Sequence, residues 1–279
     1  MDEHHGLLVS PDWLEGRLDD PDLRIVDARI YPKYIAGHIP GAVNLFVMEV
    51  TVLQNGARVV APREVVAEVV GRVGIDERTP VVIYGERGQV DAAYLFWALE
   101  YYGHPQVRLL DGGIEEWISS EKPISTEIPD VEPRSFNAKP IPERHAQWEW
   151  ILEHLNDPDV QIVDNRSPEE YTGEDVLSKR GGHIPDSILV RWEMSLDPDD
   201  LRFKPPEALD RIYREAGLDP ERTLVNYCQT GVRSAHAYFT MRLLGYPNVR
   251  VYDASWGEWG NRDDLPVEDG GEVNGEAPA

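Results

Sequence analysis

Short apolar runs alternate with longer helical patterns along this chain. The runs are rich in Val and Ile, and each has the length of one strand, as in "LRIVDAR" (23–29), "TPVVIYG" (79–85) and "VRLLD" (107–111). Between them lie segments with helical periodicity, such as "PREVVAEVVGRVG" (62–74) and "VDAAYLFWALEYYG" (90–103). This alternation is typical of a mainly parallel sheet flanked by helices. The sequence therefore predicts an α/β fold.

Glycine closes the helical patterns and so predicts where the helices end. A glycine stands at the end of each of the clearest ones, at Gly74, Gly103, Gly217 and Gly245. Helices commonly end on a residue in the left-handed conformation, and glycine adopts it without steric penalty. We expect left-handed backbone at all four positions.

The chain repeats itself at a domain-sized spacing. "GHIPGAVNL" at Gly37 recurs as "GHIPDSILV" at Gly182, and "IVDARIYPKYIAG" at Ile25 recurs as "IVDNRSPEEYTG" at Ile162. The stretch from 80 to 117 runs parallel to the stretch from 223 to 259, with one extra residue near Tyr102 in the first. Repeats this far apart indicate a duplicated domain rather than a solenoid.

The duplication sets the expected boundaries. Residues 1–127 and 148–266 are predicted to be the two domains. Residues 128–147 continue a proline-rich stretch without periodicity, which predicts a linker. Residues 267–279 are acidic and glycine-rich, which predicts a disordered tail.

Composition and charge narrow the classes of function. A formal net charge of −24 disfavours nucleic-acid binding, because phosphate contacts need a basic surface. The only cysteine excludes an internal disulfide, and no apolar run approaches the ~20 residues that cross a bilayer. The start of the chain lacks the pattern of a signal peptide. We therefore expect a cytoplasmic protein without membrane contacts, and histidines without metal-ligand spacing predict no metal.

That one cysteine, Cys228, directly follows the apolar run "TLVNY" and precedes a helical pattern. Ligands of parallel sheets bind beyond the carboxyl ends of the strands, so its position favours chemistry over packing. Ser234 is the predicted N-cap of the helix. The loop between them should form an anion-binding nest that favours the thiolate, from Gln229, Thr230, Gly231 and Val232. Arg233 would add a positive charge at its rim.

Taken together, these motifs resemble one family. The duplicated "GHIP" signature, the "VDxR" segments and the cysteine loop followed by "YDASWGEW" are similar to the two-domain rhodanese sulfurtransferases, from about Val9 to about Leu265. The resemblance implies two tandem rhodanese-like domains. The C-terminal one would be catalytic, and the N-terminal one inactive, because Gly85 stands where its nucleophile should be.

The chemistry that the resemblance implies is a double displacement without a cofactor. The thiolate of Cys228 would take the outer sulfur of thiosulfate as a persulfide, and a thiophilic acceptor such as cyanide would remove it. Asp164 and Arg166 would support the site. Without a second cysteine the sulfur must leave to an outside nucleophile, which includes the thiol of an acceptor protein.

Two departures leave the donor open. Family members that use thiosulfate often carry basic residues after the cysteine, and those that use 3-mercaptopyruvate often carry Gly-Ser, whereas this loop has Gln229 and Thr230. Glu170 stands where both groups commonly have a substrate-binding arginine, and its carboxylate is expected to repel an anionic donor. A 3-mercaptopyruvate sulfurtransferase and a sulfur-carrier module without turnover remain alternatives.

A cysteine phosphatase is a more distant alternative. Its loop also offers a thiolate, inward amides and an arginine, but it places five residues between the cysteine and the arginine. Here four residues separate Cys228 from Arg233. The shorter loop favours a sulfur atom over a phosphoryl group.

Several recurring polar and aromatic residues are interpreted as structural. His38 and His183 occupy equivalent repeat positions, one of them in the copy without a nucleophile, so both should be hydrogen-bonded within the fold. Trp117 and Trp259 also recur and should be packing residues. Trp256, Gly113 and Ser255 are expected near the rim of the sites.

Overall fold

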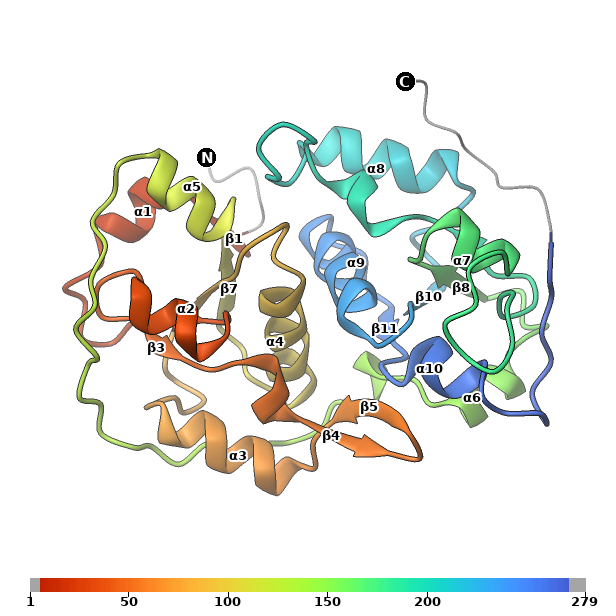
Figure 1. Cartoon of the computed structure of the whole chain (residues 1–279), viewed down its shortest axis with the longest axis horizontal. Helices are drawn as coiled ribbons and strands as arrows, with labels where there is room; N and C mark the ends of the chain where they lie inside the picture. Colours follow the sequence, from red (N-terminus) through yellow and green to blue (C-terminus); the bar gives the residue numbers. More distant parts are fainter. Residues whose placement is uncertain (1–5, 271–279) are drawn as a thin grey trace. The chain divides into compact units, whose positions relative to one another are not determined.

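The structure is a computed structural model that describes residues 6–270 in two units (Figure 1). Of these residues, the first unit contains 6–52, 60–141 and 196–203, and the second contains 53–59, 142–195 and 204–270. Each unit has its own parallel sheet with helices on both faces, so the predicted α/β class is confirmed. The predicted end points of the two domains stay a prediction.

The first unit is built on a sheet of strand order β1-β7-β6-β2-β3, in which neighbouring strands pair in parallel. Its strands are β1 (Leu8–Val9), β2 (Arg24–Asp27), β3 (Val43–Asn44), β6 (Val81–Tyr84) and β7 (Val107–Leu110). A separate two-stranded sheet is formed by β4 (Thr51–Gln54) and β5 (Ala57–Val60).

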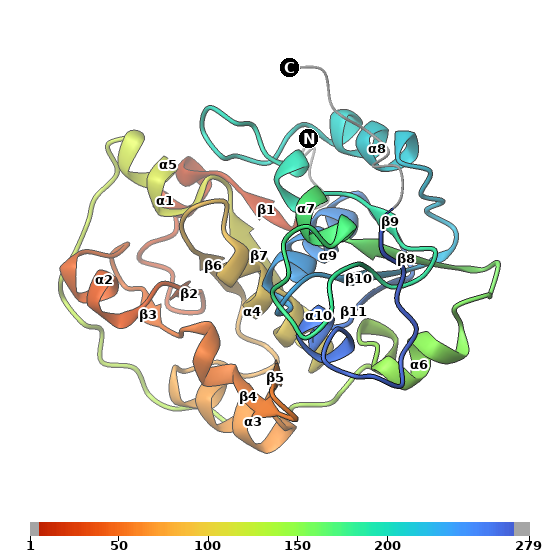
Figure 2. The same ribbon diagram turned by 45° about the vertical axis from the view of Figure 1, so that its right-hand side comes forward.

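Helices cover both faces of the first sheet (Figures 1 and 2). Side chains of α1 and α5 pack on the face that carries Ile25, Val82 and Tyr84, and α4 contacts β6 and β7. Strands buried on both sides read as continuous apolar runs, as "VVIY" does. The helices are α1 (Pro11–Glu15), α2 (Tyr31–Ala36), α3 (Arg63–Arg72), α4 (Val90–Tyr101) and α5 (Gly113–Ser119), with one 3₁₀ turn, η1 (Val47–Val50).

The second unit repeats this plan with strand order β11-β10-β8-β9, again parallel. Its strands are β8 (Val160–Asp164), β9 (Ile188–Leu189), β10 (Thr223–Tyr227) and β11 (Val249–Val251). Asp164 pairs in register with Tyr227 on one side and with Leu189 on the other. The carboxyl ends of these three strands therefore lie at one edge of the sheet.

Two groups of helices enclose the second sheet. α6 and α10 pack on the face that carries Ile162, Val225 and Tyr227, and α9 contacts β10 and β11. The helices are α6 (Trp148–Glu153), α7 (Pro168–Thr172), α8 (Pro206–Glu215), α9 (Val232–Leu243) and α10 (Ser255–Trp259), with 3₁₀ turns η2 (Pro142–Arg144) and η3 (Trp192–Ser195). Figure 1 shows α9 starting beside the end of β10.

The repeated "VDxR" and "GHIP" segments bind each other in both units. Arg166 holds Asp164 through both carboxylate oxygens and donates to the carbonyl of Gly182 at 2.8 Å. Arg29 makes the same bonds to Asp27 and, at 2.7 Å, to the carbonyl of Gly37. Because the copy without a nucleophile keeps the arrangement, these bonds maintain the fold of the sheet edge.

The residues interpreted as structural are confirmed in that role. His38 bonds through its two ring nitrogens to the carbonyl oxygens of Tyr34 and Glu127, and His183 bonds to that of Tyr171. Trp117 and Trp259 are fully buried. The closing glycines, Gly74, Gly103, Gly217 and Gly245, all have the predicted positive φ.

The predicted disordered tail is wrong for its first four residues. The backbone of Glu268 pairs with His183 in both directions, and the amide of Gly270 donates to the carbonyl of Thr172. These bonds attach the segment to the second unit despite its acidic composition, because backbone pairing does not depend on side-chain polarity. The rest of the predicted tail, 271–279, lies outside the described residues.

Within residues 6–270, no helix has the length and apolar character needed to cross a membrane. No group of three or more His, Cys, Asp and Glu side chains among these residues is placed to hold a metal ion.

Candidate active site

Cys228 lies at the carboxyl end of β10, completely buried, in a four-residue loop that leads into α9. The amide of Gly231 donates to its Sγ at 3.1 Å. Its own amide donates to the hydroxyl of Ser255 at 3.0 Å. The helix behind the loop is twelve residues long, and its N-terminal end favours negative charge. The surroundings therefore suit an anionic sulfur.

Gly231 is required at its position for two reasons. Its φ is +91°, and a Cβ added there would lie 2.7 Å from the backbone oxygen of Asp253. Residues with side chains rarely adopt such a φ, and the backbone in the way has no rotamer that relieves the contact. Glycine thus allows the loop to turn its amide toward the sulfur.

The N-cap predicted at Ser234 is wrong. α9 starts at Val232 with Gly231 as its N-cap, and Ser234 is buried in the first turn, where its hydroxyl donates to the Gly231 carbonyl at 2.8 Å. The left-handed glycine ends the loop earlier than a serine cap would. Ser234 consequently supports the loop from within the helix.

Ser255 holds the cysteine loop from the other side. Its φ of 55° is unusual for a residue with a side chain, and its hydroxyl donates to the Tyr252 carbonyl while it accepts the Cys228 amide. Two backbone bonds, from the amides of Trp256 and Gly257 to the carbonyls of Cys228 and Gln229, join the start of α10 to the loop. The expected proximity of Ser255 to the site is confirmed.

Arg233 does not point freely at the rim, because it forms an ion pair with Glu170. Its two terminal nitrogens donate to the two carboxylate oxygens at 2.6 and 2.7 Å. Burial raises the pKa of Glu170, but the hydrogen bond and charge of Arg233 outweigh this and leave it below its ordinary value. Glu170 was expected to repel an anionic donor, and the structure shows that its carboxylate is the ion-pair partner of Arg233. Sequence patterns gave no signal for this pair, which lies 63 residues apart.

The other predicted site residues lie in the cysteine loop, at the start of α9 or at the carboxyl end of β8. The side-chain amide of Gln229 donates to the hydroxyl of Ser178 at 3.1 Å, Thr230 is exposed and Val232 is half-buried. Asp164 and Arg166 are buried at the same sheet edge, where the guanidinium also lies 4.6 Å from the ring centre of Trp256. Whether these residues contact a substrate stays a prediction.

The equivalent loop of the first unit is longer and closed by its own side chain. It runs from Gly85 to Gln89, five residues against four, so the extra residue lies here and not near Tyr102 as predicted. Left-handed backbone at Arg87, Gly88 and Gln89 absorbs it. The Gln89 side chain accepts the amide of Gly85 and donates to the Leu110 carbonyl. It fills the loop in which an anion would bind.

Because α4 starts after the longer loop, Asp91 and not Val90 takes the helix position of Arg233. Burial and the nearby charge of Glu86 raise the pKa of Asp91 to about 6. The first unit thus carries an acidic group where the second carries a guanidinium.

Replacing Asp91 with Asn should stabilise the protein at pH 8. Between about pH 4 and 6 the folded state binds more protons at Asp91 than the unfolded state, so wild-type stability falls as pH rises through this window. The Asn variant avoids that loss and should gain about 1 to 2 kcal/mol in unfolding free energy at pH 8, and almost nothing at pH 4. Urea titrations at the two pH values measure it. Asp19→Asn, at an exposed site, is the control, and equal gains for both variants would contradict the prediction.

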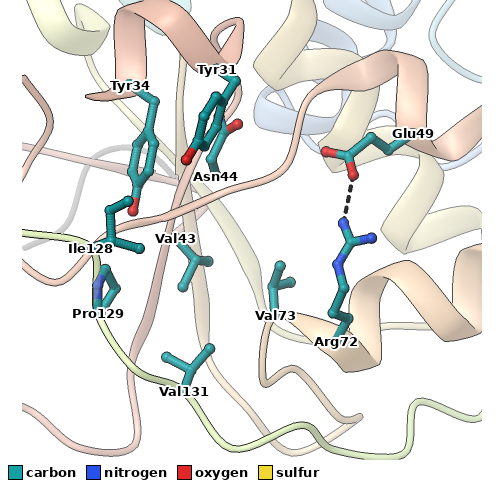
Figure 3. Close-up of a pocket in the computed structure, with 10 residues that line it drawn as sticks. All are labelled: Tyr31, Tyr34, Val43, Asn44, Glu49, Arg72, Val73, Ile128, Pro129 and Val131. Atoms are coloured by element: carbon teal, nitrogen blue, oxygen red, sulfur yellow. Dashed lines mark hydrogen bonds and ion pairs between the residues drawn. The ribbon is translucent and has the colours of Figure 1, made fainter. Parts of the chain in front are cut away.

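A groove of about 390 Å³ in the first unit is unrelated to these loops (Figure 3). Glu49 and Arg72 form an ion pair in it, the Asn44 amide donates to two carbonyls, and the Tyr34 hydroxyl donates to the carbonyl of Ala42. These polar groups bind protein atoms. The groove therefore gives no indication of a second reactive site.

Comparison with known proteins agrees with the fold and with the duplication. The model of the rhodanese-like domain matches this sequence twice, over residues 10–120 and 147–262. The chain belongs to the rhodanese family. The prediction of a two-domain rhodanese sulfurtransferase, made from the repeats and the cysteine loop, is therefore confirmed.

Full-length relatives bear different names. The chain is 34% identical over 263 residues to the thiosulfate sulfurtransferase of Azotobacter vinelandii, covering 94% of this chain and 97% of that protein. It is 36% identical over 287 residues to the sulfur carrier protein TtuD of Thermus thermophilus, with 96% and 99% covered. Both relatives span the two rhodanese domains.

Solved structures are similar over nearly the whole chain. One is the anaerobic ergothioneine biosynthesis enzyme of Chlorobium limicola in complex with its natural substrate trimethyl histidine. Its TM-score is 0.88 at 26% sequence identity, and the match covers 97% of this chain and 72% of that chain.

Proposed function

We propose that this chain transfers a sulfane sulfur from thiosulfate, or a related donor, to a thiophilic acceptor such as cyanide through a persulfide on Cys228. The observation that carries the proposal is the Gly231 amide 3.1 Å from the buried Sγ at the end of β10. Relatives of this length named thiosulfate sulfurtransferase support the choice of donor.

The proposed reaction balances without a cofactor or an oxidant. The Cys228 thiolate attacks the outer sulfur of thiosulfate, a new S–S bond forms, and the old S–S bond breaks with its electron pair leaving on sulfite. Cyanide then attacks the terminal sulfur of the persulfide, which releases thiocyanate and restores the thiolate. The Gly231 amide and the N-terminal end of α9 favour the negative charge that stays on the enzyme throughout.

The acceptor in the cell is a separate part of the proposal. Cys228 is the only cysteine, so no internal thiol can resolve the persulfide. A small thiophile or the thiol of an acceptor protein must take the sulfur. The relative named as a sulfur carrier protein favours a protein acceptor as the second candidate, and turnover with cyanide separates an enzyme from a carrier that only relays sulfur.

Two other activities are compared with the proposed one. 3-Mercaptopyruvate remains a donor to be tested beside thiosulfate. Four residues between Cys228 and Arg233 argue against a phosphatase. The first unit is proposed to be inert, since Gly85 has no nucleophile and Gln89 fills its loop. A cytoplasmic location is still inferred from the sequence alone.

Arg233→Ala should lower kcat/KM for thiosulfate by about one to two orders of magnitude. A charge-assisted contact from its guanidinium to the donor's oxyanion is worth roughly 1.5 to 3 kcal/mol, and each 1.36 kcal/mol is a factor of ten. Steady-state kinetics at several thiosulfate concentrations measure the loss. The backbone amides remain, so some activity should persist, and lysine should rescue it only in part.

The matched control removes the carboxylate that the Ala variant leaves behind. Glu170 is buried, so Arg233→Ala exposes the site to an unbalanced negative charge. That charge could by itself weaken donor binding, and Glu170→Gln removes it. If Arg233 binds the donor, kcat/KM should still be lower in the Arg233→Ala, Glu170→Gln double variant than in Glu170→Gln alone. If kinetics recover fully in the double variant, Arg233 serves only to balance Glu170 and does not bind the donor.

A further inference from the structure

The two predicted site arginines, Arg166 and Arg233, are both paired with carboxylates. Arg166 binds Asp164, and Arg233 binds Glu170 through two hydrogen bonds. Glu170 is only 5% exposed, whereas the Arg233 side chain is 22% exposed. With the thiolate present, the sum of these five charges is negative. Among these five groups, a dianionic donor therefore meets no excess of positive charge.

The hydrogen bonds of Glu170 engage one edge of the planar Arg233 guanidinium. They use one N–H on each terminal nitrogen, which is the end-on fork that a substrate carboxylate or sulfonate would otherwise take. The remaining N–H groups, on Nε and on the outer side of the terminal nitrogens, form no hydrogen bond within residues 6–270. An anion can still bind there, but beside the negative charge of Glu170.

We infer that Glu170 is a specificity-determining residue, whose carboxylate occupies the end-on fork of Arg233 and weakens the binding of reactants, thiosulfate included, that carry an oxyanion next to the reacting sulfur or carbon. This inference rests on the proposed function only for the identity of the donor. The charge effect itself concerns any reagent that attacks or is attacked at Cys228.

The charge of Glu170 can be removed without removing its structural role. Glu170 and Ser167 form a capping box at the start of α7: the Ser167 amide donates to Oε2, and the Glu170 amide donates to the serine hydroxyl. Glutamine serves equally well at this position of a capping box. Glu170→Gln therefore keeps the cap of α7 and still offers Arg233 one amide oxygen.

Alkylation of Cys228 measures the anion preference without turnover. Iodoacetate carries a carboxylate and iodoacetamide does not, while both alkylate the same thiolate, so the ratio of their rates cancels changes in the fraction of thiolate. Glu170→Gln should raise the iodoacetate-to-iodoacetamide ratio about tenfold over the wild type, because a repelling charge beside the guanidinium is gone. Since Cys228 is the only cysteine, alkylation needs no site mapping.

Two control variants separate charge at this position from other effects. Glu169→Gln makes the same change of charge one residue away, at an exposed side chain, and its ratio should stay within about twofold of the wild type. Glu170→Asp keeps the charge and shortens the side chain, and its ratio should stay within about threefold. The inference is wrong if Glu170→Gln leaves the ratio unchanged or lowers it, or if Glu170→Asp raises it equally.

Thiosulfate kinetics then connect the inference to the reaction. KM for thiosulfate should fall about tenfold in Glu170→Gln and stay unchanged in Glu169→Gln. A raised alkylation ratio in a protein that forms no thiocyanate would support the role of Glu170 and reject the proposed function. Thiocyanate formation by the wild type together with an unchanged ratio in Glu170→Gln would do the reverse.

Discussion

Cys228→Ser should lose thiocyanate formation from thiosulfate and cyanide by at least about a thousandfold. The reaction needs a nucleophile that is ionised near neutral pH and can hold a second sulfur, and a serine hydroxyl does neither. Both half-reactions pass through the Sγ atom of Cys228, so no other residue can maintain turnover without it. Because Gly85 offers no nucleophile in the first unit, no residual turnover is expected from there.

Folding should survive this substitution, which makes the loss interpretable. Serine is slightly smaller than cysteine, and its hydroxyl can accept the Gly231 amide that Sγ accepts now. The melting temperature should therefore change by only a few degrees. Thiocyanate is measured by its coloured iron complex, with heat-treated protein as the blank. Turnover close to that of the wild type in a Ser variant would remove Cys228 from the mechanism.

Arg166→Ala should lower the unfolding free energy by about 3 to 5 kcal/mol. Arg166 is 1% exposed and its partner Asp164 is fully buried, so the variant leaves an uncompensated charge inside the second unit. It also removes the bond to the Gly182 carbonyl, which attaches the "GHIP" segment to the end of β8. Urea unfolding followed by circular dichroism measures the change.

Arg222→Ala is the matched control for this effect. Arg222 pairs with Asp219 at 3.6 Å, and both side chains are more than 40% exposed. Exposed ion pairs contribute 1 kcal/mol or less, so the control should change little. Equal losses for the two variants would show that the buried pair contributes no more than a surface pair.

The fold followed from the sequence because its signals are local and occur twice. Strand-length apolar runs such as "VVIY" and helical patterns closed by Gly103 or Gly245 each report on a few neighbouring residues. Because the domain is duplicated, each of these patterns occurs a second time, which supports its interpretation. Cys228 was identified in the same way, from its position between a strand and a helix.

Errors arose where backbone conformation decides the outcome. Alignment of the two repeats by residue identity placed the extra residue of the first copy near Tyr102. In the structure it lies in the loop between β6 and α4, where left-handed backbone at Arg87 and Gln89 accommodates it. The same conformation at Gly231 starts α9 before Ser234. Positive φ is rare for residues with side chains such as Arg87 and Gln89, so composition gives little warning of it in that loop.

The ion pair of Arg233 with Glu170 could not be read from the sequence for a different reason. Each residue was noticed on its own, and Ser167 with Glu170 even forms a recognisable S-x-x-E cap pattern. The two meet only because β8 and β10 are neighbours in the sheet and end at one edge. Contacts across 63 residues depend on this topology, which no local pattern encodes.

Mass spectrometry of the intact protein after exposure to thiosulfate tests the central claim most directly. The wild type, freed of excess donor, should carry one added sulfur, located on the peptide that contains Cys228. Addition of cyanide should return the protein to its original mass and release one equivalent of thiocyanate, while Cys228→Ser gains no mass. Turnover by a wild-type protein that never gains sulfur, or gains it on another residue, would contradict a persulfide on Cys228.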